Sequence, residues 1–339
     1  MRYLSLATSA CALLLAAWTA AAAPPNYQMT PLASPPDGSL EATAMNNRGE
    51  VIGWYTHDGI QHGFIWRNGQ FTTLNERFNP AVLYMEPQGL NNRSQISGNF
   101  SNWETGRFSG FLLDGNNLRI IDGPPGAQYV WVSGINDHGT MFGTSYDADG
   151  NESSWVLKDG TYTVLDPNFL PVRMNKRGVI VGQLFVPPFF TYAAYWKNGE
   201  IVTVEPSHTF GTGLNDRGLM TGTHLGNGAF VWGPGYFEYL PPLRQYAFSV
   251  TGSPNNAGDI VGTTEYTEYV TINRATLWTE GSVYDINSLI DPADPLREYV
   301  TLQHASHINK RGDILARGTD SRSAGLVYYF LKPVQEAAE

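Results

Sequence analysis

A unit of about forty residues recurs along this chain and limits its possible folds more than any other feature. Each copy opens with Asn-x-x-Gly, as at Asn46 and Gly49, and continues into a short apolar strand that ends in Gly53. Aligned on their first Asn, the copies begin at Asn46, Asn91, Asn136, Asn175, Asn215, Asn255 and Asn309, with intervals of 45, 45, 39, 40, 40 and 54 residues. A period of about 40–45 residues made of short β-type segments is the size of one four-stranded propeller blade. The sequence therefore predicts an all-β repeat fold.

Turn signals mark two hairpins in each copy. Asn at the first position and Gly at the fourth are the preferences of a type I turn. Ser94 takes the Gly place in the second copy, and at positive φ it would cost its copy about 1 kcal/mol. In the last copy, Ala316 takes the place of the strand-ending Gly. The second hairpin is indicated by dipeptides typical of tight turns, namely Asn68-Gly69, Asp159-Gly160 and Asn198-Gly199.

The two ends of the repeat array predict a closed ring. The seventh copy reaches the apolar strand 325–330 and lacks a fourth strand, whereas residues 28–32 align with the fourth strand 70–74 of the first copy. We therefore expect residues 27–32 to pair beside Gly325–Phe330 and complete a seven-bladed β-propeller of four-stranded antiparallel blades. Pro31 suits an outer edge strand, where a missing N–H costs little. We expect a single propeller domain over residues 24–333, followed by a tail over 334–339.

These motifs resemble the HAF repeat family of predicted extracellular repeat proteins. The family pattern is an Asn-Asn-x-Gly turn, a Val-Val-Gly strand and an aromatic-Trp-x-Asn-Gly hairpin, matched here in the first copy by 46–53 and 63–69. The second, third and seventh copies lack the Trp of the pattern. The resemblance implies a secreted protein, and it carries no set of catalytic residues to this chain.

The N-terminal residues 1–23 have the pattern of a secretory signal peptide. Arg2 precedes an apolar run from Leu4 to Trp18, and small residues follow up to Ala23. The chain's one cysteine, Cys11, lies inside this segment. A formal net charge of −10 and a pI near 5.2 argue against nucleic acid and anionic membrane surfaces as partners. We expect a secreted or periplasmic monomer that does not insert into a membrane once the signal is removed.

Strand order places both Gly-rich turns on one face of the ring and the irregular segments on the other. Irregular loops on a rigid scaffold are where binding residues concentrate, so this variable face is the predicted ligand face; its longest segments are 75–88, 184–192, 264–274 and 287–306. Its aromatic side chains could stack on sugar rings or anchor a protein, or could simply cover the blade cores. The candidates are Trp103, Trp131, Tyr129 and Phe190. The Trp residues whose place is fixed by the repeat are expected in the core: Trp66, Trp196, Trp232 and Trp278.

The position two residues before each repeat Asn faces the centre of the predicted ring. It is occupied by Ala44, Gly89, Gly134, Arg173, Gly213, Ser253 and His307. Small residues allow the innermost strands to crowd the axis, so Arg173 and His307 depart from the rule. Either they have a structural role in a solvated channel, or they form a polar site at the channel mouth. They lie three copies apart, on roughly opposite sides of the axis.

No residue motif specifies a reaction. Gly-x-Ser-x-Gly, His-Glu-x-x-His and phosphate-loop patterns do not occur. The segment 147–152 resembles part of a calcium loop without the spacing of an EF-hand, so no cofactor is expected and calcium is a weaker alternative. The leading hypothesis is a non-enzymatic binding or scaffold protein that recognises a glycan or an extracellular protein. The alternative is an exported hydrolase or lyase in which Arg173 holds an anionic group and His307 or His304 is the general base.

Overall fold

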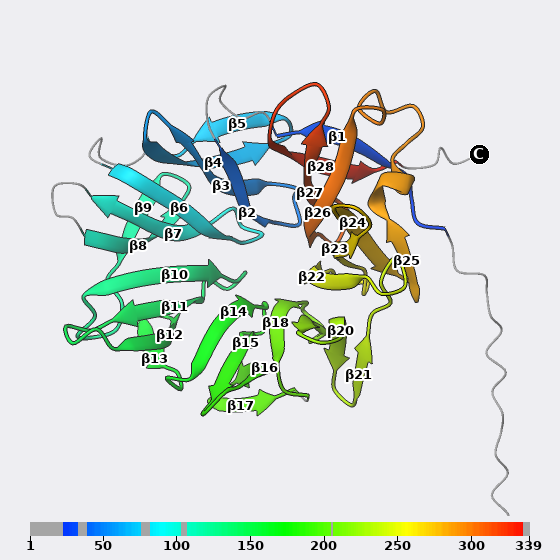
Figure 1. Ribbon diagram of the computed structural model, residues 1–339. Helices are drawn as coiled ribbons and strands as arrows, with labels where there is room; N and C mark the ends of the chain where they lie inside the picture. Colours follow the sequence, from blue (N-terminus) through cyan, green and yellow to red (C-terminus); the bar gives the residue numbers. More distant parts are fainter. Residues whose placement is uncertain (1–22, 33–38, 76–81, 103–106, 205, 335–339) are drawn as a thin grey trace, which may run out of the picture.

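The computed structural model describes residues 23–32, 39–75, 82–102, 107–204 and 206–334, and it shows an all-β protein. Antiparallel sheets are arranged around a central axis in the manner of a propeller (Figure 1). Five sheets have four strands each. The first contains β10 (Tyr129–Ile135), β11 (Met141–Tyr146), β12 (Glu152–Lys158) and β13 (Thr161–Val164). The second contains β14 (Phe169–Met174), β15 (Ile180–Val186), β16 (Phe190–Lys197) and β17 (Glu200–Thr203). The third contains β18 (Thr209–Leu214), β19 (Met220–His224), β20 (Gly228–Gly233) and β21 (Tyr236–Tyr239).

The fourth and fifth of these sheets close the array. One contains β22 (Phe248–Pro254), β23 (Ile260–Thr267), β24 (Thr271–Thr279) and β25 (Ser282–Asp285), and it is followed by the short 3-10 helix η2 (Ile286–Leu289). The other combines β26 (Val300–Ile308), β27 (Ile314–Asp320) and β28 (Leu326–Pro333) with β1 (Tyr27–Pro31).

The sixth sheet has eight strands. It contains β2 (Leu40–Met45), β3 (Val51–His57), β4 (Ile60–Arg67), β5 (Gln70–Thr73), β6 (Val82–Leu90), β7 (Ile96–Asn102), β8 (Arg107–Asp114) and β9 (Asn117–Ile121). Its two halves each run in the same order as a four-stranded sheet. They join where β4 pairs with β6 in parallel through Gln61 and Tyr84.

The predicted pairing of the two ends of the array is confirmed, but the partner residues are 328–333 instead of the expected 325–330. Strand β1 lies antiparallel to β28, with Tyr27 opposite Pro333 and Pro31 opposite Tyr329. Pro31 lies on the outer edge of this sheet, as expected. Beyond it, the Leu32 amide donates to the Tyr328 carbonyl at 2.8 Å.

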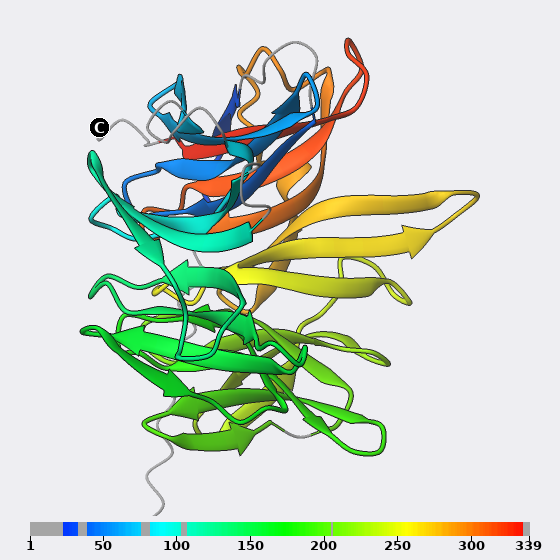
Figure 2. The same ribbon diagram turned by 90° about the vertical axis from the view of Figure 1, so that its left-hand side faces the viewer.

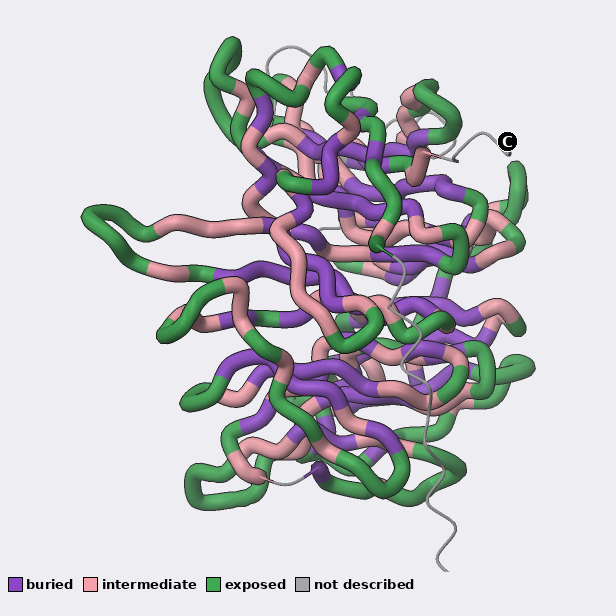
Figure 3. The backbone as a smooth tube through the Cα atoms, turned by 90° about the vertical axis from the view of Figure 1, so that its right-hand side faces the viewer, coloured by how far each residue is buried: buried purple, intermediate pink, exposed green. Residues whose placement is uncertain are grey.

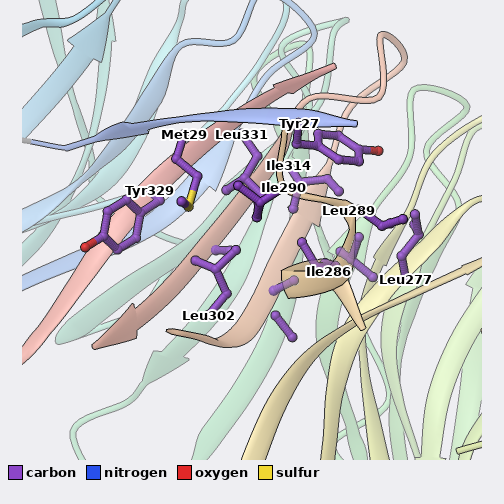
Figure 4. Close-up of a cluster of buried hydrophobic side chains, with 14 of the residues drawn as sticks. Tyr27, Met29, Leu277, Ile286, Leu289, Ile290, Leu302, Ile314, Tyr329 and Leu331 are labelled. Carbon is purple, nitrogen blue, oxygen red and sulfur yellow. The ribbon is translucent and has the colours of Figure 1, made fainter. Parts of the chain in front are cut away.

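The segment after η2 holds β1 from the other side. Tyr27 and Met29 pack against Ile286, Leu289 and Ile290 in one buried cluster with residues of β26 to β28 (Figure 4). The buried carboxylate of Asp294 accepts the Met29 amide at 2.6 Å. The N-terminal strand is therefore fixed by two segments that are distant from it in the sequence.

The Asn-x-x-Gly turns have the predicted conformation. In the first copy, the Gly49 amide donates to the Asn46 carbonyl at 3.1 Å, and Gly49 has φ of 76°. Ser94 has φ of 61°, the left-handed conformation in which a non-glycine residue is strained. Its hydroxyl donates to the Glu50 carboxylate at 2.5 Å, which offsets part of this strain.

The repeat Asn has a second role that its turn preference does not indicate. Each Asn is buried, and its Oδ1 accepts the amides two and four residues later; for Asn215 these are Arg217 and Leu219, both at 2.9 Å. Its Nδ2 donates to the backbone carbonyl of the next repeat Asn, as from Asn215 to Asn255 at 2.8 Å. The last Asn, Asn309, donates to Asn46 at 3.3 Å and closes the circle. All seven bonds span 2.8–3.3 Å, linking 46 to 91, 91 to 136, 136 to 175, 175 to 215, 215 to 255, 255 to 309 and 309 to 46.

The glycines expected to end a strand lie inside it instead, since β3 continues from Gly53 to His57, and they allow a bulge in the innermost strand. A Cβ at any of them would lie 1.9–2.4 Å from a carbonyl oxygen of that strand: Gly53, Gly98, Gly143, Gly182, Gly222, Gly262 and Gly318. In the last copy this role falls to Gly318 rather than to the aligned Ala316, because β26 carries two register shifts instead of one. Only a residue without Cβ fits so close to the neighbouring backbone.

Two segments expected as irregular loops are largely strand. Residues 184–192 and 264–274 extend the hairpins β15–β16 and β23–β24, leaving short turns at 187–189 and 268–270. The β23–β24 hairpin projects farthest from the ring (Figure 2). These strands continue because their residues keep pairing across the hairpin, from Ile260 opposite Trp278 to Thr267 opposite Thr271.

The core is divided into apolar clusters that lie within and between neighbouring sheets. Figure 3 shows the buried stretches of chain in the interior and the exposed ones at the turns. Trp66 and Trp278 are buried as expected, whereas Trp196 and Trp232 are half-buried and pack against the edges of such clusters. Across the described residues, no helix has the length and apolar character needed to cross a lipid bilayer.

Candidate ligand site in the central channel

A cavity of about 420 Å³ lies among the innermost strands around the axis. Many of its lining residues precede the repeat Asn by two to five positions, so it lies on the variable-face side of the asparagine circle. Its volume is within the range of about 300–1,000 Å³ typical of small-molecule sites. Residues from several different sheets of the ring line this cavity.

Arg173 enters this cavity from β14. Its Nη1 donates to the Val172 carbonyl at 3.0 Å, and among the described residues no carboxylate forms an ion pair with it. The side chain is exposed to the solvent of the channel, and the protein that surrounds the channel lowers the pKa of its guanidinium. Because the guanidinium faces the channel and has no acidic partner, its N–H groups are available to an anionic ligand.

His307 enters the same cavity from β26. Its Nδ1 lies 2.9 Å from the Ser306 hydroxyl oxygen. Burial, and to a lesser extent the positive charge of Arg173, lowers the pKa of His307 to about 3. The two residues that break the small-residue rule therefore line one cavity, even though they come from separated sheets.

A second polar group lines the cavity beside His307. The Tyr328 hydroxyl donates to Glu41 Oε1 at 2.7 Å, and Arg317 Nη1 lies 3.5 Å from Glu41 Oε2. His304 Nδ1 lies 3.1 Å from the Thr263 hydroxyl. All of these residues line the cavity.

The pKa values of this second group follow from burial and from their neighbours. Burial lowers the pKa of His304, the nearby Arg317 lowers it further, and Glu265 opposes the shift. Burial and the hydrogen bond to Glu41 raise the pKa of the Tyr328 phenol. At neutral pH the two histidines are therefore uncharged, and the arginines carry the positive charge of the cavity.

Sequence reasoning missed Glu41, Arg317 and Tyr328, although a signal existed for two of them. Glu41 and His304 both lie five residues before their repeat Asn, and Arg317 lies eight residues after Asn309. These positions also face the channel. A search of every channel-facing column for charged residues would have found them.

The three aromatic candidates that the structure describes do not line the cavity. Tyr129 is exposed, Trp131 is half-buried beside Phe108, and Phe190 is exposed beside Tyr192 and His208. Trp103 lies outside the described residues. Of the predicted site residues, the structure brings together Arg173 and His307.

The segment considered for calcium forms a self-contained turn. Asp147 Oδ1 accepts the amides of Asp149 and Asn151, both at 2.9 Å, and its Oδ2 accepts the Asn151 side-chain amide at 2.9 Å. In the part of the chain that the structure describes, no three His, Cys, Asp or Glu side chains are grouped to hold a metal ion.

Comparison with known proteins identifies the architecture and no family. No family model matches the chain, and no curated protein sequence matches it. Solved propellers do match. The β-propeller domain of the Trilobed protease from Pyrococcus furiosus matches with a TM-score of 0.57 and 8% identity, over 88% of this chain and 98% of the other.

Two further structures give the same picture. An acylaminoacyl peptidase from Pyrococcus horikoshii matches with a TM-score of 0.59 and 10% identity, over 88% of this chain and 52% of that enzyme. YCF48 from Cyanidioschyzon merolae matches with a TM-score of 0.54 and 9% identity, over 89% of this chain and 98% of the other. This chain thus spans about half of the peptidase. At these identities the likeness establishes the propeller fold alone.

Proposed function

We propose that the ring has seven blades, with the eight-stranded sheet counted as two. Its halves have the strand order of single blades and are joined by the single pairing of Gln61 with Tyr84. The circle of seven buried asparagines supports the same count. The sequence periodicity and the resemblance to HAF repeats agree with this proposal.

We further propose that the protein is a secreted or periplasmic binding or scaffold propeller, whose ligand is a glycan or an extracellular protein. The observation that carries this proposal is the channel cavity, where residues that depart from the repeat meet on the variable-face side. The repeated Asn-x-x-Gly turns are nearly alike around the ring and offer no distinctive place for one ligand. A single asymmetric site requires residues that differ from blade to blade, as Arg173, His307 and Glu41 do.

Binding is better supported than hydrolysis or lyase chemistry. A general base works best when its pKa lies near the working pH. With a pKa of about 3, His307 is uncharged at neutral pH but accepts a proton poorly. The peptidase propellers support a shared fold only, because their identity to this chain is so low.

Export is proposed from the signal-like residues 1–23, most of which lie outside the described residues. The proposal predicts that the mature chain begins near Ala21–Pro24 when the full sequence is expressed with its own leader. N-terminal sequencing of the protein from the medium or periplasm tests this. Recovery of the intact leader in the cytoplasmic fraction would contradict it.

A glycan array and a pull-down from extracellular proteins test the binding role. The wild-type mature chain is compared with Arg173→Gly, which installs the residue found at three equivalent positions, and with Trp131→Ala on the variable face. The control is Arg177→Gly in a repeated turn. We expect a ligand whose capture is lost with Arg173→Gly and kept with the control. A ligand lost only with the control would place the site on the turn face and contradict the proposal.

A further inference from the structure

We propose that the channel cavity binds the carboxylate of an acidic saccharide, with Arg173 as the main contact. This inference rests on the proposed binding function and specifies its ligand class. Charged side chains and hydroxyl groups line the cavity, and the repeat itself does not require them there.

The charge balance of the cavity favours an anion. By formal charge the lining holds two cations, Arg173 and Arg317, and one anion, Glu41, while the lowered pKa values of His304 and His307 leave both histidines uncharged at neutral pH. The lining therefore carries a net charge of about +1 inside a protein whose formal net charge is −10. A channel with low-dielectric walls concentrates this local field, so an anion is drawn into the cavity despite the acidic exterior.

Arg173 is the cation left without a partner. Glu41 lies 3.5 Å from Arg317 and is also hydrogen-bonded to Tyr328, whereas no described carboxylate pairs with Arg173. The guanidinium presents parallel N–H groups that match the two oxygens of a carboxylate. A bound carboxylate would supply the counter-charge that Arg173 lacks.

The remaining lining suits hydroxyl groups rather than apolar ones. Thr212 and Thr251 point their hydroxyls at each other at 2.6 Å, and the Ser253 hydroxyl accepts the Ile308 amide at 3.2 Å. Within the described residues, the Gln183 side chain in this lining makes no hydrogen bond to protein. Hydroxyls and an amide can exchange hydrogen bonds with the hydroxyls of a sugar ring. An apolar acid would leave the Gln183 amide unmatched.

The test is isothermal titration of the mature chain at pH 7 with galacturonate and its dimer. Galactose supplies the same ring without the carboxylate, acetate supplies the carboxylate without the ring, and inorganic phosphate is a different anion. We expect saturable binding of the uronates, weakened about ten- to hundredfold by Arg173→Gln, since a charge-assisted contact is lost. Arg177→Gln makes the same charge change in a repeated turn outside the cavity and should leave the affinity within about twofold, because its charge is distant from the ligand and screened.

The outcomes separate this inference from the proposed function. Equal binding of galactose, tighter binding of phosphate, or uronate binding that survives Arg173→Gln overturns the acidic-saccharide assignment. If an array ligand without a carboxylate depends on Arg173, the inference fails and the binding function stands. If no ligand of any class depends on Arg173, both fail. Thermal melting of each variant confirms that the ring is intact, which is expected because other blades carry small residues at this position.

Discussion

Replacing Asn215 by Ala should weaken the ring by more than the loss of a turn. The substitution removes two local hydrogen bonds, from the Arg217 and Leu219 amides, and the bond to the Asn255 carbonyl of the next sheet. Asn215 is buried, so these groups cannot all be satisfied by bulk water. Each buried group that loses its partner costs about 1–3 kcal/mol. With the Asn255 carbonyl still accepting from Gly258, we expect a total loss of about 2–4 kcal/mol.

The chain contains a matched control for this prediction. Asp147 accepts the amides two and four residues later, as the repeat Asn does, but it belongs to an outer turn and makes no bond to another sheet. Asp147 is also less buried than Asn215, so Asp147→Ala should cost clearly less stability than Asn215→Ala. Urea unfolding of both variants gives the two losses of unfolding free energy. We assign the difference between them to the inter-sheet hydrogen bond of Asn215 and to the burial of that residue. Equal losses in the two variants would refute the structural role assigned to the asparagine circle.

Three further predictions concern the turns, the closure and the channel. Gly139→Val should destabilise the protein by about 1–2 kcal/mol or more, because a β-branched residue tolerates φ of 81° poorly. Ser94→Gly should leave the stability nearly unchanged. Equal losses of stability in the two variants, measured by calorimetry, would contradict this. Asp294→Ala should cost about 1–3 kcal/mol of stability and speed hydrogen exchange at the Met29 amide, because that amide loses its buried acceptor. Unchanged exchange at Met29 would show that β1 is held without the Asp294 carboxylate. Because the pKa of His307 is depressed to about 3 from its ordinary 6.5, the unfolded chain binds more protons between these values, so stability should fall as pH falls through that window. His307→Gln should reduce this loss in pH-dependent urea unfolding, and an unchanged slope would contradict the shift.

The architecture was predictable because its signals are local or repeated. The Asn-x-x-Gly pattern indicates a turn without knowledge of its neighbours, and Ser94 could be assigned positive φ from its alignment alone. The closure by β1 could be predicted because the first and last copies are incomplete in complementary ways. Repetition supplies in one chain several independent copies of the same local preference.

The rest depends on distances that only the closed ring sets. The turn preference already accounts for the repeat Asn, so nothing in the sequence showed that Asn309 would reach Asn46 across 263 positions of chain. The meeting of Arg173 with His307 likewise depends on the width of the channel. The contacts among Glu41, Arg317 and Tyr328 join three strands, and pairing of this kind has no local signal.

The most direct test of the central claim is a crystal structure of the mature chain soaked with galacturonate. The claim is that the residues departing from the repeat form one ligand site in the channel, on the variable-face side of the asparagine circle. It predicts difference density in the cavity, with a carboxylate facing the Arg173 guanidinium and sugar hydroxyls near Thr212 and Thr251. An empty cavity, with ligand density on the repeated turns or on the projecting β23–β24 hairpin, would contradict it.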